Sequence, residues 1–180
     1  MYRTLAPGAI GVQVPFPEAV ALAARHGFEG ITVDYGLIER MGLDEVRRLL
    51  DQHAIRPAIT GLPVRFRDDL ATFESDMAAL PPVAQALADL GCTRASSWFP
   101  PFHETLGYDE QFALMRERLA ILCDAIAPYG LRYGLEFIGP ASFRRGKPNV
   151  YIHDLPGLLE LIEAVGRDNL GVLLDAWHWY

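Results

Sequence analysis

Two acidic residues occupy equivalent positions in the last two strand–helix repeats of this 180-residue chain. Gly134-Leu135 leads into Glu136, and the apolar run from Gly171 to Leu174 leads into Asp175. Because neighbouring parallel strands end ~5 Å apart, we expect the two carboxylates to converge on one cavity. They would repel each other unless a cation lay between them or one were protonated. The pattern favours a divalent metal held by Glu136 and Asp175. Alternatively, each acid caps the following helix or pairs with an arginine.

A histidine follows the second acid after three residues. His178 belongs to the loop above the strand end, where it could contact a substrate hydroxyl or the metal. The alternative is a histidine that forms a hydrogen bond with a neighbour and holds Asp175 in place. Carboxylate oxygens with an added imidazole suit Mn²⁺ or Mg²⁺ best and admit Co²⁺ or Zn²⁺.

Other candidates for substrate contacts lie in the loops after the strands. Trp98 and His103 follow the fourth expected strand and could line a pocket. The alternative for His103 is a loop residue without a role in binding, because catalytic histidines are rare. Arg144 belongs to a basic cluster with Arg145 and Lys147 in the long loop 138–152. This cluster could bind a substrate phosphate or carboxylate, and a solvated loop is the simpler alternative.

Helical and apolar segments alternate along the whole chain. We expect helices at 17–26, 43–53, 70–90, 109–129 and 155–165, with Pro81-Pro82 kinking or splitting the third. Short strands are expected at 9–13, 30–33, 57–60, 93–97, 132–137 and 170–174. Such alternation predicts parallel pairing, because a helix must return the chain before each new strand.

Two α/β architectures fit this pattern. One is a doubly wound open sheet, and the other is a (β/α)₈ barrel, which needs eight strands. The chain contains neither a GxGxxG sequence after the first strand nor a Walker loop, so nucleotide binding lacks its usual signature.

Composition restricts the classes of partner. The net charge of −7 argues against a protein that binds the nucleic-acid backbone. The sequence contains no run of 18 apolar residues, so no membrane span is expected. The N-terminus lacks the features of a signal peptide. Cys92 and Cys123 are isolated and are expected to be reduced core residues of a cytoplasmic protein.

The segments GLEFIGP and NVYIHDLPGLLELIEAVGRDNLGVLLDAWHWY resemble the sugar phosphate isomerase/epimerase family, which has a xylose isomerase-like TIM barrel. The resemblance implies an eight-stranded barrel with one divalent metal. It further implies that Glu136 is a metal ligand and acid/base catalyst, Asp175 a ligand and His178 a substrate contact. The implied reaction is isomerisation or epimerisation of a sugar, sugar phosphate or polyol by proton transfer through an enediolate.

The family's metal-binding histidine on strand seven and glutamate on strand eight have no counterpart before residue 180. We therefore expect residues 1–180 to form a single incomplete barrel domain, with about six parallel strands and five helices but without the last two βα units. Its open edges would favour a homo-oligomer. Two alternatives remain: an inactive barrel fragment or oligomeric non-enzyme, and an endonuclease IV-like DNA repair enzyme, which the negative charge disfavours.

Overall fold

The computed structural model describes residues 2–179, and the side chains of residues 2–178. The chain divides into two compact units. The first comprises the residues up to Leu62 together with Pro82–Ala95, and the second comprises Pro63–Pro81 together with the chain from Ser96 onward. Helix α4 (Leu70–Leu90) and strand β4 (Arg94–Trp98) each contribute residues to both units.

The first unit contains a small parallel sheet in the order β1-β2-β3. Its strands are β1 (Thr4–Leu5), β2 (Gly30–Ile31) and β3 (Arg56–Pro57). Three helices accompany them: α1 (Phe16–Arg25), α2 (Tyr35–Met41) and α3 (Leu43–Gln52), with a 3₁₀ turn, η1, at Pro7–Ile10. The helices bury one apolar face each, including Val20 and Val46, which have no exposed surface.

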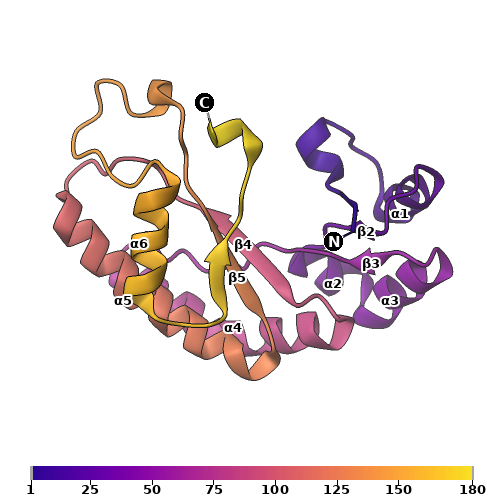
Figure 1. Cartoon of the computed structure of the whole chain (residues 1–180). Coiled ribbons are helices and arrows are strands. Elements are labelled where there is room, and N and C mark those ends of the chain that lie inside the picture. The colour runs from indigo at the N-terminus through magenta and orange to yellow at the C-terminus, as the bar shows by residue number, and fades with distance from the viewer. Residues whose placement is uncertain (1, 180) are drawn as a thin grey trace. The chain divides into compact units, whose positions relative to one another are not determined.

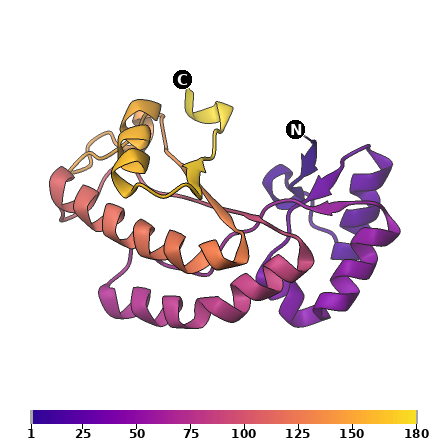
Figure 2. The ribbon, with the colours of Figure 1, turned by 60° about the horizontal axis from the view of Figure 1, so that its bottom comes forward.

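The second unit contains a sheet in the order β4-β5-β6, whose last two strands lead to the acids Glu136 and Asp175 (Figure 1). Strands β5 (Arg132–Glu136) and β6 (Leu170–Val172) pair in parallel. Helices α5 (Tyr108–Ile126) and α6 (Leu155–Val165) pack against each other and against this sheet (Figures 1 and 2). The unit also contains three 3₁₀ turns: η2 (Ala127–Tyr129), η3 (Ala141–Phe143) and η4 (Ala176–Trp179).

Side-chain alternation along β5 decides which residues reach the site. Tyr133, Leu135 and Phe137 are buried in the core. Because successive side chains of a strand point to opposite faces, Glu136 lies on the face opposite to these three. A one-residue shift of this strand would bury the carboxylate among apolar side chains.

A buried arginine ties a loop to the helical layer of the second unit. Arg118 on α5 is 6% exposed, and its guanidinium donates hydrogen bonds to the carbonyl oxygens of Phe66, at 2.9 Å, and of Asp68. The guanidinium also lies 5.1 Å from the ring centroid of Phe73 at the start of α4. In the segment before α4, the carbonyls of Phe66 and Asp68 therefore accept hydrogen bonds from a side chain instead of from the backbone N–H groups of a neighbouring strand.

The structure confirms parallel strands in two sheets, neither of which closes, as expected for an incomplete barrel, and it corrects several boundaries. The strand expected at 9–13 is wrong: the first strand is Thr4–Leu5, and Pro7–Ile10 forms η1. A sixth helix, α2, was not expected, because its seven residues are too few to show a clear helical period. Asp34 caps α2 by accepting a hydrogen bond from the Leu37 backbone N–H at 2.8 Å.

The prolines do not split the third expected helix. α4 runs from Leu70 to Leu90 through Pro81 and Pro82 (Figure 2). Each proline lacks an N–H, so the carbonyls of Met77 and Ala78 lose their usual helical donors. The helix nevertheless continues, because Leu80, Val83, Ala84 and Leu87 around the prolines are all buried and hold this stretch in place.

Both cysteines are buried and free of disulfide bonds, as expected. None of the helices in the described part of the chain is both long and apolar enough to span a membrane. The single domain expected over residues 1–180 stays a prediction, as does the cytoplasmic location.

We predict that Arg118→Met lowers the free energy of unfolding by about 2–4 kcal/mol, because the buried Phe66 carbonyl and the partly buried Asp68 carbonyl lose charge-assisted hydrogen bonds. Arg116→Met is the matched control: Arg116 is exposed on the same helix, so its replacement should stay within about 0.5 kcal/mol. Urea unfolding followed by circular dichroism measures both. Equal stability of the two variants would show that the Arg118 contacts do not stabilise the fold.

Candidate metal centre

Three side chains that can bind a metal meet where β5 and β6 end. Each of Glu136, Asp175 and His178 offers one ligand atom, and these atoms all lie within 4.8 Å of one another. His178 Nε2 lies 3.5 Å from Glu136 Oε1, and both side chains are largely buried, at 9% and 17% exposure. The structure therefore brings together the two carboxylates predicted as ligands and adds the histidine to them.

The parallel register of β5 and β6 places the two acids. Tyr133 pairs with Leu170 and Leu135 with Val172, so β5 ends one residue beyond the end of β6 at the same edge of the sheet. Glu136 is the last residue of β5, and Asp175 follows three residues after the end of β6. The two acids converge because both follow strands that end at the same edge of the parallel sheet.

The turn η4 brings His178 back toward Glu136. Asp175 begins this turn: its Oδ1 accepts a hydrogen bond from the Trp177 N–H at 2.9 Å, and its carbonyl accepts one from the His178 N–H at 3.1 Å. The capping role considered for Asp175 is thus present together with its position in the cluster. A single carboxylate can do both, because each oxygen has two lone pairs.

A glycine makes room for this turn. A Cβ atom added at Gly139 would lie only 2.1 Å from the carbonyl oxygen of His178. The loop after β5 and the backbone of η4 therefore approach so closely that only glycine fits between them. Gly139 is a positioning residue that the sequence did not reveal, because the backbone that requires a glycine there is that of His178, 39 positions away.

The electrostatics of the cluster favour a proton or a cation. Burial raises the pKa of Glu136, the His178 ring opposes this shift, and the nearby Asp175 carboxylate raises the pKa further. Without a cation, Glu136 therefore retains its proton to a higher pH than an exposed glutamate does. His178 Nδ1 is buried and has no hydrogen-bond partner among the described residues, which leaves one polar atom of the cluster unsatisfied.

The donor set fits a divalent metal. Two carboxylates and one imidazole match the ligand types of Mn²⁺, Mg²⁺, Co²⁺ and Zn²⁺, and the cluster would satisfy only part of the coordination shell of any of them. A bound cation would also remove the repulsion between Glu136 and Asp175.

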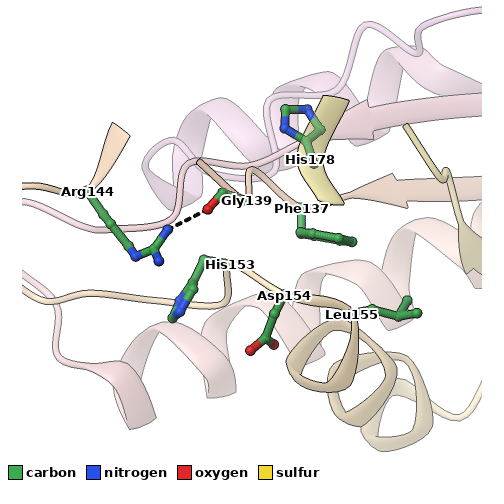
Figure 3. Close-up of a pocket in the computed structure, with 7 residues that line it drawn as sticks. All are labelled: Phe137, Gly139, Arg144, His153, Asp154, Leu155 and His178. Carbon is green, nitrogen blue, oxygen red and sulfur yellow. Dashed lines mark hydrogen bonds between the residues drawn. The ribbon is translucent and has the colours of Figure 1, made fainter. Parts of the chain in front are cut away.

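An open cavity of about 600 Å³ adjoins the cluster through His178 (Figure 3). Phe137, Gly139 and Arg144 line it from the loop after β5, and residues 153–155 line it from the start of α6. Of the expected substrate contacts, Arg144 and His178 are at this cavity. The lining residues His153 and Asp154 were missed, because the sequence marks Asp154 only as the cap of a helix.

Trp98 and His103 lie elsewhere in the second unit. Trp98, at the end of β4, is 50% exposed, and the Arg67 guanidinium lies 4.8 Å from its ring centroid. The His103 ring accepts hydrogen bonds at Nδ1 from the backbone N–H groups of Thr105 and Leu106, at 3.1 and 2.9 Å. His103 therefore organises its own loop, and neither residue lines the cavity beside His178. Their substrate contacts stay predictions.

Comparison with known proteins identifies the fold. Residues 20–180 match the family model described as "Xylose isomerase-like TIM barrel". The 2-oxo-tetronate isomerase of Haemophilus influenzae is 26% identical over 178 residues, which covers 92% of this chain and 65% of that enzyme. This chain thus spans about two-thirds of that relative's length.

Two solved structures are similar over the whole chain. A xylose isomerase domain protein from Alicyclobacillus acidocaldarius superposes with a TM-score of 0.88 at 25% identity, and this chain covers 65% of it. An IolI protein described with a bound zinc atom superposes with a TM-score of 0.82 at 19% identity, which demonstrates a shared fold; this chain covers 64% of it.

We predict that protons compete with the metal at Glu136. Because the pKa of this carboxyl is raised, metal binding must displace a proton, so affinity falls as the pH drops through that pKa. The apparent dissociation constant for Mn²⁺ should rise toward about tenfold per pH unit once Glu136 is protonated. Calorimetric titration between pH 7 and pH 4 measures this. An affinity that stays constant over this range would contradict the assignment, and Asp175→Asn should weaken binding at every pH.

We also predict that Gly139→Ala disturbs the centre, since the added methyl group must displace the backbone at His178. Stability should fall by about 1–3 kcal/mol, as overpacking usually costs, and Mn²⁺ binding should weaken. The control is Gly171→Ala in β6, where an added Cβ meets no atom within 4 Å. Thermal unfolding and calorimetry test both variants, and unchanged Mn²⁺ affinity in Gly139→Ala would refute the role given to this glycine.

Proposed function

The chain belongs to the xylose isomerase-like TIM barrel family, and from this premise we propose that it carries part of the active site of a divalent-metal-dependent isomerase or epimerase. The substrate would be a sugar, a sugar phosphate or a polyol-derived ketone. The observation that carries the proposal is the convergence of Glu136, Asp175 and His178 at the end of β5 and β6.

The relatives support the same chemical class. The name 2-oxo-tetronate isomerase describes an enzyme that acts on a hydroxylated keto acid, and the IolI structure is described with zinc. An isomerase or epimerase of such compounds must remove a proton from a carbon next to a carbonyl group and return it. This reaction needs a base near the C–H bond and a way to stabilise the negative oxygen that forms.

The residues of this chain divide these tasks. Glu136, Asp175 and His178 would hold the cation, which when bound would polarise the substrate carbonyl. The Glu136 carboxylate accepts the proton from the carbon next to the carbonyl, the C–H electron pair forms the enediolate double bond, and the carbonyl π pair moves onto its oxygen. An isomerisation is completed when the proton is returned to the neighbouring carbon, and an epimerisation needs a second group that returns a proton on the opposite face. The raised pKa of Glu136 in the metal-free chain moves this carboxyl toward the working range of a proton-transfer group.

His178 has a second role in this proposal. Its ring is within 6.3 Å of Phe137, centroid to centroid, and it lines both the acidic cluster and the cavity. Its position beside the cavity supports the expected contact with a substrate hydroxyl, as the alternative to a bond with the metal. The phenyl ring of Phe137 limits how the imidazole can rotate.

The test is proton exchange at carbon in deuterated water. With Mn²⁺ and a panel of hydroxyketones and sugars, the protein should introduce deuterium next to the substrate carbonyl, which NMR detects. Glu136→Gln should reduce this rate about 10²- to 10⁴-fold, because it removes the group that accepts the proton.

Glu163→Gln makes the same chemical change at an exposed position of α6 and should leave the rate unchanged. If Glu136→Gln and Glu163→Gln exchange deuterium at the same rate, Glu136 is not the proton-transfer group. Absence of exchange from every compound of the panel, with Mn²⁺ bound, would count against the reaction itself.

A further inference from the structure

The cavity beside His178 has polar groups that the proton-transfer chemistry does not use. Arg144, His153 and Asp154 line it together with the apolar side chains of Phe137 and Leu155 (Figure 3). A volume of about 600 Å³ is within the range of small-molecule sites, and a few polar groups on an apolar wall are typical of them.

Arg144 is held in place and still has donors to offer. It is half-buried, and its guanidinium donates one hydrogen bond to the Gly139 carbonyl oxygen (Figure 3). A guanidinium has five N–H donors, so four remain for a ligand. No carboxylate among the described residues forms an ion pair with Arg144. Its positive charge at the cavity is therefore uncompensated by direct contact.

The neighbouring basic residues differ from Arg144. Arg145 is exposed and is not part of the cavity wall. Lys147 lies over the Phe102 ring and pairs with Glu104 at 3.4 Å. Of the basic cluster recognised in the sequence, only Arg144 lines this cavity.

His153 and Asp154 supply acceptors in the same cavity. The His153 Nδ1 atom lies 2.8 Å from the Tyr151 carbonyl oxygen. A carbonyl oxygen can only accept, so Nδ1 carries the proton and Nε2 of the neutral ring is left as an acceptor. Asp154 uses Oδ1 to cap α6 through the Gly157 N–H, at 2.9 Å, and its second oxygen has no partner among the described residues. The cavity thus combines a cationic donor with two acceptors.

We propose that this cavity binds the anionic end of a hydroxylated substrate, namely a sugar acid or a sugar phosphate. Arg144 binds the carboxylate or phosphate, and His153 Nε2 and Asp154 accept hydrogen bonds from adjacent hydroxyl groups. His178 joins this cavity to the metal-binding cluster, so the reacting end of the same molecule lies at Glu136. The inference rests on the proposed function for that reacting end, and the binding of the anion can be measured without turnover.

The experiment compares three four-carbon probes by calorimetry in the presence of Mg²⁺: threonate, threitol 4-phosphate and neutral threitol. At least one anion should bind about tenfold or more tightly than threitol, and the stronger of the two identifies the anionic group. Arg144→Gln should remove this preference and leave threitol binding unchanged. Arg145→Gln is the matched control and should stay within about twofold of the unmodified protein, because that side chain is outside the cavity.

Arg144→Lys keeps the positive charge and should retain part of the preference, and thermal unfolding of each variant checks that the loop still folds. Threitol binding as tightly as both anions would overturn the proposal. Equal losses of anion affinity in Arg144→Gln and Arg145→Gln would also overturn it, because they would indicate only a general electrostatic attraction of anions to the basic loop. Glu136→Gln should preserve the anion preference, so loss of turnover in that variant tests the proposed reaction and leaves the anion site to be judged separately.

Discussion

The site depends on one constraint, the parallel register of β5 against β6. This pairing makes the two strands end at the same sheet edge, so that Glu136 and Asp175 approach each other although they are 39 positions apart in the sequence. Bringing two carboxylates together costs free energy unless a proton or a cation offsets the repulsion. The packing of Tyr133 and Leu135 in the core supplies the rigidity that holds the strand end against this repulsion.

The loop after β5 serves two neighbouring parts of the site. Near its start, Gly139 allows the backbone of η4 to approach, and its carbonyl also accepts the hydrogen bond from Arg144. The same residue therefore helps to orient His178 and the guanidinium. His178 belongs both to the acidic cluster and to the cavity lined by Arg144, and the proposed substrate, with a carbonyl at one end and an anion at the other, would use both.

Much of the helical layer was predictable, and the errors have local causes. The 155–165 helix agrees with its expected bounds, because Asp154 caps it and Gly166 closes it in a left-handed conformation. The first strand was misplaced, since Ala9–Gln13 has a strand-like apolar pattern but Pro7 and Gly11 favour the turn η1. Pro81 and Pro82 were expected to interrupt a helix whose buried face instead holds it together.

The sequence by itself determined the alternation of helices and strands and the two acids at successive strand ends. These features follow from periodicity and from residue type, which are local properties. Only the tertiary structure decided that His178 turns back onto Glu136, that Arg144 rather than Arg145 lines a cavity, and that His103 stabilises its own loop. Each of these depends on contacts between segments distant in the chain, or on the path of a loop, which no local pattern encodes.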